Sequence, residues 1–202
     1  NFFVYLHYSK IHTGIMNEVL KVYDNFSEDF FKNKKLNQKR YAKLFKGAEN
    51  YLQGILNEIY QLGLNENSII LVMSDHGISV GEKLGERAYA AYCYDYTLRT
   101  FTYFIIPGIQ SREITQQVRT IDIMPTLLDY LEIPLDNRYN TIDGVSLLPL
   151  IQGKSIPEFY AFSETGNPLR EESPPEEPNV KSIRNSNWKL ILNEYNNSKE
   201  LY

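Results

Sequence analysis

The chain has 202 residues, of which 43% are hydrophobic and 23% are charged, and its formal net charge at pH 7 is -4. That length suffices for a domain with a sizeable core, and the acidic balance gives no indication of nucleic-acid binding, which usually needs a basic surface. No run of about 18 apolar residues occurs, so the sequence predicts no membrane-spanning helix. The chain begins at Asn1 without Met, inside an apolar run, and we expect from this that an N-terminal portion of the same protein is missing.

Two apolar, β-rich runs are predicted to form buried strands in the first half of the chain. The first is Phe2–Leu6, and His12 lies in the polar segment beyond its end. His7 still belongs to the strand and is interpreted as structural, and the same structural role stays open for His12. The second run, Ile69–Met73, is uniformly apolar and stops abruptly at Ser-Asp-His-Gly, residues 74–77.

The segment between these strands is predicted to be largely helical. Residues 17–35 have a loosely helical pattern that ends in a basic run, Lys32–Lys35, which we interpret as a solvated face. From Asn37 to Leu62 the apolar residues recur at spacings of three and four, which indicates an amphipathic helix, and Gly63 supplies its C-terminal stop. Strand, helix and strand in this order imply a right-handed crossover and parallel strands.

Asp75 and His76 follow the second strand, at the edge where open parallel α/β sheets bind their ligands. A carboxylate oxygen beside an imidazole nitrogen is a natural pair of metal ligands. Gly77 permits the tight turn that would direct both side chains inward. The loop that follows has three small residues and four charges, with Lys83 and Arg87 as its cations, and this composition suggests a functional loop. The alternative for Asp75 and His76 is a polar turn without a functional role.

The remaining pattern changes from separated strands to closely spaced ones. A third buried strand is predicted at Phe101–Ile106, and a helix over Ile121–Leu131 begins near Asp122, where a carboxylate suits the helix dipole. Shorter strands follow from Tyr160 and in a hairpin over Val180–Leu192.

We therefore predict an α/β fold with a parallel or mixed central sheet flanked by helices and a small C-terminal antiparallel sheet. The predicted domains are residues 1–155 and 156–202. A further strand is expected to start at Leu201, and Pro168–Pro178, rich in Pro and Glu, is expected to be an exposed loop.

The order of these segments resembles the sulfatase branch of the alkaline phosphatase superfamily. The resemblance extends over nearly the whole chain and depends on several motifs in the right order. The matching stretches are Phe2–Leu6 with His12, Leu64–Gly77, Gly81–Lys83, Tyr94-Asp95, Leu98–Thr100, Val118–Leu128, Asp143–Leu150 and Lys189–Ile191.

The resemblance implies an alkaline-phosphatase-like sheet and a metal-dependent hydrolase of sulfate esters, whose substrate is a small sulfate or phosphate ester. Asp75 and His76 would bind one divalent cation together with carboxylates upstream, with Ca2+ as the first choice and Mn2+ or Zn2+ as alternatives. His12 would serve the reacting oxygen as hydrogen-bond donor or general acid. Lys83 and Arg87 would meet the charged oxygens of the sulfate, although each is equally interpretable as a solvated loop charge.

The departures from the family pattern concern the nucleophile. In the family it lies, with two carboxylates, ahead of the segment that starts this chain, so the resemblance implies a C-terminal fragment that is inactive alone. Cys93 lacks the Cys-x-Pro-x-Arg context of a sulfatase nucleophile and is interpreted as a buried structural thiol. Tyr89 stands roughly where phosphatase-like relatives carry an additional His, which favours a one-metal site. Two alternatives remain open: a phosphodiesterase or phosphonate monoester hydrolase of the same superfamily, and a non-catalytic pseudoenzyme module.

Overall fold

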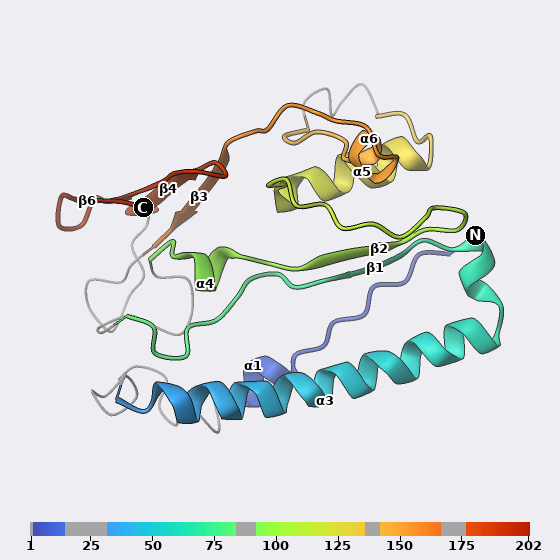
Figure 1. Ribbon diagram of the computed structural model, residues 1–202, viewed down its shortest axis with the longest axis horizontal. Helices are drawn as coiled ribbons and strands as arrows, with labels where there is room; N and C mark the ends of the chain where they lie inside the picture. The colour runs from blue at the N-terminus through green and yellow to red at the C-terminus, as the bar shows by residue number, and fades with distance from the viewer. Residues whose placement is uncertain (1, 15–31, 84–91, 136–141, 167–176) are drawn as a thin grey trace. The chain divides into compact units, whose positions relative to one another are not determined.

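The chain divides into two compact units, one formed by Asn1–Pro107 with Thr165–Glu177 and the other by Gly108–Glu164 with Pro178–Tyr202. Each unit is described by itself, and the predicted domain division at residue 155 stays a prediction. The computed structural model describes residues 2–14, 32–83, 92–135, 142–166 and 177–202 (Figure 1).

The described part of the first unit contains one long helix, α3, which spans Lys34–Gln61 (Figure 1). The predicted helix and its stop are confirmed: Gly63 has a left-handed φ of 67°, and its N–H donates to the carbonyl of Tyr60 at 3.1 Å. A short helix, α1 (Lys10–Gly14), packs against α3. The rings of Tyr8 and Tyr51 stack there with centroids 4.8 Å apart. Among the described residues, no helix is both long enough and apolar enough to cross a membrane.

The described part of this unit also contains two short strands, β1 (Ile70–Met73) and β2 (Thr102–Ile105). The 3-10 helix η2 (Leu64–Asn67) precedes β1, and the short helix α4 (Asp95–Leu98) precedes β2. Both predicted strands are confirmed, but they pair antiparallel, with Ile70 opposite Ile105 and Met73 opposite Thr102. The predicted parallel pairing is therefore wrong for these strands. An apolar run predicts burial but not direction. Parallel strands need a long crossover connection, usually a helix. In the described part of the connection between β1 and β2, the only helix is the four-residue α4.

The predicted strand Phe2–Leu6 is also wrong. Residues 2–9 are extended but form no strand, and the side chains of residues 2–7 are exposed, Phe3 by 87%. An extended segment becomes a strand only when a neighbouring backbone exchanges hydrogen bonds with it. The described residues supply no such neighbour. His12 consequently lies in α1 and not beyond the end of a strand.

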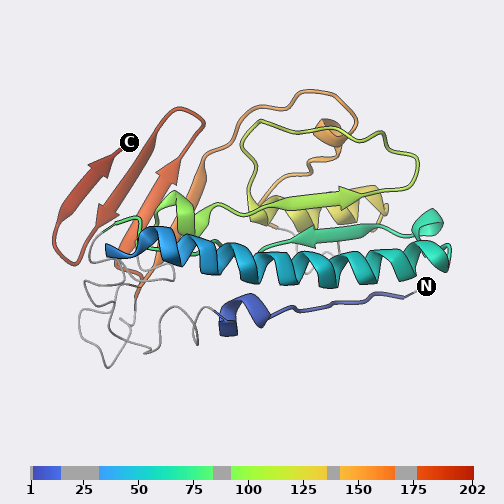
Figure 2. The same cartoon turned by 60° about the horizontal axis from the view of Figure 1, so that its bottom comes forward.

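The second unit combines short helices with a four-stranded sheet. The helices are η3 (Thr120–Asp122), α5 (Ile123–Tyr130) and α6 (Leu148–Ile151). The sheet has the order β3-β4-β5-β6, and Figure 2 shows these strands side by side. They are β3 (Ala161–Thr165), β4 (Val180–Arg184), β5 (Lys189–Asn193) and β6 (Ser198–Leu201).

The predicted C-terminal hairpin is confirmed, because β4 and β5 pair antiparallel and β6 continues the antiparallel order beside β5. Alternate residues of β4 and β5 point into the core, and Val180 and Ile191 are fully buried there. The fold class is α/β with a small C-terminal antiparallel sheet, as the sequence predicts. The expected loop at Pro168–Pro178 lies almost entirely outside the described residues.

Candidate active site

The turn that follows β1 is held by backbone contacts on both sides. Ser74 donates its N–H to the carbonyl of Phe101 at 3.2 Å, and the N–H of Phe101 returns a hydrogen bond to the Ser74 hydroxyl at 3.2 Å. Gly77 donates its N–H to the carbonyl of Thr97 at 2.8 Å. A side chain at Gly77 would collide with the carbonyl of Tyr96, so glycine is required here by a close approach of two backbones. Asp75 and His76 lie between these two anchors.

The side chains of Asp75 and His76 are mutually oriented. The His76 N–H donates to Oδ1 of Asp75 at 2.8 Å, and Nδ1 of His76 lies 2.6 Å from the carbonyl oxygen of Gly77. Because a carbonyl only accepts, Nδ1 carries the proton and Nε2 is the basic nitrogen of the ring. Nε2 lies 3.7 Å from Oδ2 of Asp75, and the Asp75 side chain is 75% exposed.

This pair fits one edge of a cation site. Oxygen and nitrogen ligands lie about 2.0–2.6 Å from Zn2+ or Ca2+, so two donors to one ion are separated by roughly 3–4 Å. The 3.7 Å between Oδ2 and Nε2 falls in that range. A metal-binding His usually donates its other ring N–H to a carbonyl or carboxylate, as Nδ1 does here to Gly77. The pair alone is incomplete: among the described residues, no three His, Cys, Asp or Glu gather where they could hold a metal ion.

The remaining residues considered for the site, apart from Lys83, are His12, Arg87 and Tyr89. His12 is exposed on α1, and it does not form a metal-binding group of three with Asp75 and His76. Its predicted role therefore stays a prediction. Arg87 and Tyr89 lie outside the described residues.

Lys83 is the described cation of the loop, and an aromatic side chain restrains it. Its ammonium nitrogen contacts the hydroxyl of Tyr94 and lies 4.2 Å from the centroid of the same ring, a cation–π arrangement. Tyr94 is buried and stacks on Tyr96 with centroids 5.6 Å apart. The ammonium group of Lys83 therefore lies against the Tyr94 side chain, and its role toward an anion stays a prediction.

Sequence reasoning missed the residues that shape the loop before Lys83. Oε2 of Glu82 accepts from the N–H of Val80 at 2.7 Å and from the hydroxyl of Ser79 at 3.0 Å. Nδ2 of Asn37, a buried residue of α3, donates to the carbonyl of Val80 at 3.2 Å. The available signal is Asn37 itself, a polar residue four positions before Tyr41 on the apolar face of the helix. Cys93 is buried, which confirms its interpretation as a buried thiol.

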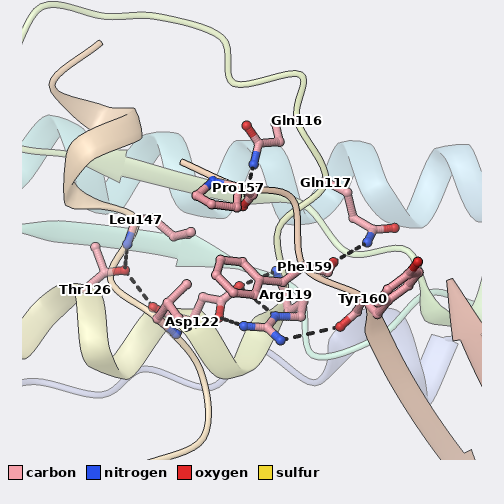
Figure 3. Close-up of polar contacts among 10 residues, drawn as sticks. Gln116, Gln117, Arg119, Asp122, Thr126, Leu147, Pro157, Phe159 and Tyr160 are labelled. Carbon is pink, nitrogen blue, oxygen red and sulfur yellow. Dashed lines mark hydrogen bonds and ion pairs between the residues drawn. The ribbon is translucent and has the colours of Figure 1, made fainter. Parts of the chain in front are cut away.

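The second unit contains a different polar centre, built on Asp122 (Figure 3). Oδ2 accepts from the backbone N–H and Nε of Arg119 at 2.9 and 3.1 Å, and Oδ1 accepts from Nη2 of Arg119 at 2.7 Å and the N–H of Val145 at 3.0 Å. The hydroxyl of Thr126 donates to the Asp122 carbonyl at 2.6 Å and accepts from the N–H of Leu147 at 2.9 Å. Every oxygen of this carboxylate is therefore occupied by protein donors.

The same centre reaches the segment that leads into β3. Nη1 of Arg119 points at the carbonyl of Tyr160, 3.4 Å away, and the guanidinium carbon lies 5.1 Å from the centroid of the Phe159 ring (Figure 3). Nε2 of Gln117 donates to the carbonyl of Phe159 at 3.0 Å. Three segments distant in sequence are thus joined by one buried ion pair, which gives Asp122 a structural role.

The arrangement of elements matches the fold of solved sulfatase-like structures. The phosphonate monoester hydrolase of Silicibacter pomeroyi superimposes with a TM-score of 0.68 at 22% identity, covering 82% of this chain and 34% of that chain. The sulfatase family model matches residues 1–133, more than half of the sequence, so the chain belongs to the sulfatase family.

Curated relatives support the same family. Arylsulfatase K of Bos taurus is 33% identical over 96 residues, covering 47% of this chain and 17% of the relative. The extracellular sulfatase SULF-1 homolog of Drosophila melanogaster is 29% identical over 105 residues, covering 52% of this chain and 9% of the relative. The chain thus spans less than a fifth of the length of either protein.

Proposed function

We propose that these residues contribute one edge of the active site of a metal-dependent hydrolase that cleaves sulfate esters. The observation that carries the proposal is the Asp75–His76 pair, whose Oδ2 and Nε2 lie 3.7 Å apart on a turn anchored to Phe101 and Thr97. A rigid turn that holds a carboxylate and a tautomerically defined imidazole together is suited to cation binding. Membership of the sulfatase family supports the sulfate ester as substrate.

The residues take the following roles in this proposal. Asp75 and His76 hold one divalent cation, with Ca2+ preferred and Mn2+ or Zn2+ accepted; when bound, it stabilises negative charge on the ester oxygens. Lys83, held against Tyr94, places a fixed positive charge for the sulfate oxygens. His12 donates a hydrogen bond or a proton to the reacting oxygen. Arg87 is a second candidate for the sulfate.

The isolated 202-residue chain is proposed not to turn over substrate. Its one cysteine, Cys93, is buried and lacks the Cys-x-Pro-x-Arg sequence of a sulfatase nucleophile. Removing the nucleophile from a covalent mechanism costs several orders of magnitude in rate. A purified chain that hydrolyses an aryl sulfate, and continues to do so after Cys93→Ala, would contradict this part of the proposal.

A calorimetric titration with Ca2+, Mn2+ and Zn2+ tests the metal site. We expect saturable binding of at least one cation, lost in Asp75→Asn and in His76→Gln and retained in Glu66→Gln, which removes another carboxylate of the same unit. Equal binding in all four proteins would overturn the assignment of the pair. Turnover of an aryl sulfate and of a phosphonate monoester by the natural gene product carrying these residues then decides between the two hydrolase activities.

A further inference from the structure

The first half of α3 carries a row of exposed lysines that the proposed active site does not use. Lys35, Lys39, Lys43 and Lys46 recur at spacings of four, four and three, which places them one above another on a single helix face. We call these four residues the lysine stripe. At a rise of about 1.5 Å per residue, the stripe extends for about 16 Å along the helix.

The charge of this segment is concentrated and one-sided. From residue 32 to residue 48 the sequence contains no Asp or Glu, although the chain as a whole has a net charge of -4. The nearest carboxylates in sequence are Asp29 and Glu49, and Glu49 pairs with Lys46 at 2.6 Å. The cations of the segment are Lys32, Lys34, Lys35, Lys39, Arg40, Lys43 and Lys46.

The N-terminal end of the stripe, at Lys35 and Lys39, borders a surface hollow. A surface depression of about 550 Å³ is lined by six consecutive or nearly consecutive residues, four of them lysines: Lys32, Asn33, Lys34, Lys35, Leu36 and Lys39. Four of the described residues that line this one concave space are lysines. That arrangement concentrates positive potential and attracts anions to it.

This arrangement costs helix stability. Like charges four residues apart on a helix repel each other. The first turn of α3 has no acidic residue, so the lysines there also oppose the helix dipole. A bound polyanion would offset both the repulsion between the lysines and their unfavourable interaction with the helix dipole. Water and salt only screen these two interactions.

The second half of the same helix shows that its solvent face does not need lysines. Five turns, or 18 residues, bring a helix position back to the same angle. Positions 18 residues after Lys35, Lys39 and Lys43 are occupied by Gln53, Asn57 and Gln61. Neutral amides thus occupy this face in one half of α3, and ammonium groups occupy it in the other.

The stripe offers little of the aromatic and apolar surface used for other polyanionic partners. Tyr41 and Phe45 lie on the opposite side of α3, where Phe45 packs edge-on against Phe101 with centroids 6.3 Å apart and burial raises the pKa of Tyr41. Membrane-surface helices insert an apolar face beside the basic one, and single-stranded nucleic acids are bound by stacking on aromatic rings. On the stripe side of this segment Leu36 is exposed and lines the hollow, but a single leucine is not an apolar helix face, and the described aromatic rings Tyr41 and Phe45 point away.

Asn37 connects the stripe with the candidate active site. It lies between Lys35 and Lys39 in sequence, and its side chain donates to the Val80 carbonyl from the other face of the helix. The first turns of α3 and the described part of the loop that contains Lys83 are therefore in direct contact. A chain molecule bound along the stripe begins next to that loop.

We propose that the lysine stripe and its hollow bind a sulfated polysaccharide, so that the enzyme holds the polymer whose ester groups it cleaves. The identity of this polymer rests on the proposed sulfate-ester hydrolysis. The site rests on charge complementarity between a linear row of ammonium groups and the repeated anions of a linear chain. Lysine suits such a partner, because its flexible stem lets a point charge follow anions of variable position.

Binding of dextran sulfate to the purified protein, with uncharged dextran as reference, tests the proposal over a range of salt concentrations. We expect the triple variant K35Q/K39Q/K43Q to bind dextran sulfate at least about tenfold more weakly, with a salt dependence shallower by roughly two to three units of log–log slope. The control variant K154Q/K181Q/K199Q removes the same charge elsewhere and should stay within about twofold of the parent. The variant Q53K/N57K/Q61K extends the stripe and should bind more tightly.

Three results would overturn the proposal. Equal weakening in the stripe and control variants would mean that only net charge matters. Tighter, stripe-dependent binding of duplex DNA or of phosphatidylserine vesicles would assign the surface to nucleic acid or membrane. Unchanged dextran sulfate binding in the stripe variant, with helix content unchanged by circular dichroism, would leave the lysines without this role. Failure of the proposed function is recognised separately, as loss of cation binding or of aryl sulfate turnover in proteins whose stripe is intact.

Discussion

Two carboxylates, Asp75 after the strand β1 and Asp122 at the start of the helix α5, have opposite surroundings. Asp122 is 2% exposed and accepts four hydrogen bonds, three of them from Arg119. Asp75 is 75% exposed, and the contacts described for it come from the adjacent His76. One carboxylate is surrounded by protein donors, whereas the other is held in place by the backbone around it and presents its oxygens outward.

The difference shows where stability and binding are located in this chain. A buried carboxylate whose lone pairs are all occupied has no capacity left for a ligand, and its removal damages the fold. An exposed carboxylate on an anchored turn contributes little to the fold but retains that capacity. The comparison predicts that substitutions at the two positions separate stability from cation binding.

The largest expected effect is at Asp122. Asp122→Ala leaves the guanidinium of Arg119 and the N–H of Val145 without their acceptor inside the second unit. Breaking a buried ion pair from one side costs about 3–5 kcal/mol. Urea denaturation should show this loss, and Asp129→Ala, at an exposed carboxylate of α5, serves as the control. A loss below about 1 kcal/mol would mean that the ion pair is not a structural centre.

Gly77 tests the anchors of the exposed site. Gly77→Ala places a methyl group against the carbonyl of Tyr96, and forced overpacking of this kind costs about 1–3 kcal/mol. Gly54→Ala is the matched control, because nothing lies within 4 Å of a Cβ there and the position is inside α3, where alanine should stabilise by about 0.5–1 kcal/mol. Thermal unfolding of both variants measures the contrast. If the two substitutions changed the melting temperature in the same direction, the close approach at Gly77 would be unsupported.

Substitutions at Tyr94 test how Lys83 is held, and we expect them to change the free energy of unfolding less than Gly77→Ala does. Tyr94→Phe removes the hydroxyl that contacts the ammonium group but keeps the ring beneath it. Loss of one hydrogen bond to a charged group costs about 1.5 kcal/mol at most when the charge remains solvated. Denaturant titration should give a value below that limit, and Tyr94→Leu, which also removes the ring, should cost more. Equal losses in the two variants would show that the cation–π contact contributes nothing.

These contrasts also mark how far the sequence predicts the structure. The apolar run before Asp75 predicts a strand with a polar turn at its end, and α3 follows from spacings of three and four, because both patterns are local. The direction of β1 against β2 is not local, and neither is the absence of a strand partner for Phe2–Leu6 among the described residues. Burial of an apolar run is compatible with either pairing.

The same distinction applies to the candidate site. Asp75, His76 and Lys83 were identified because they stand beside a strand end in a recognisable order. The contacts of Asn37 with Val80 and of Asp122 with Val145 join residues 43 and 23 positions apart. No periodicity encodes such contacts, so the residues that shape the loop and fix the second unit emerge only from the folded chain.

The smallest effect on stability, and the sharpest test of the comparison, is expected at Asp75. Asp75→Asn keeps an oxygen to accept from the N–H of His76, and the side chain is largely in solvent, so the free energy of unfolding should change by less than about 0.5 kcal/mol. The charge that attracts a cation is lost, however. Melting temperatures measured with and without Ca2+ should therefore be equal in Asp75→Asn, whereas the parent should gain stability as the cation concentration rises above its Kd. Glu66→Gln, which changes a carboxylate before β1, should behave as the parent does. If Asp75→Asn instead destabilised the chain as much as Asp122→Ala while the Ca2+ response persisted, the carboxylate after β1 would be structural, and the contrast between the two sites would fail.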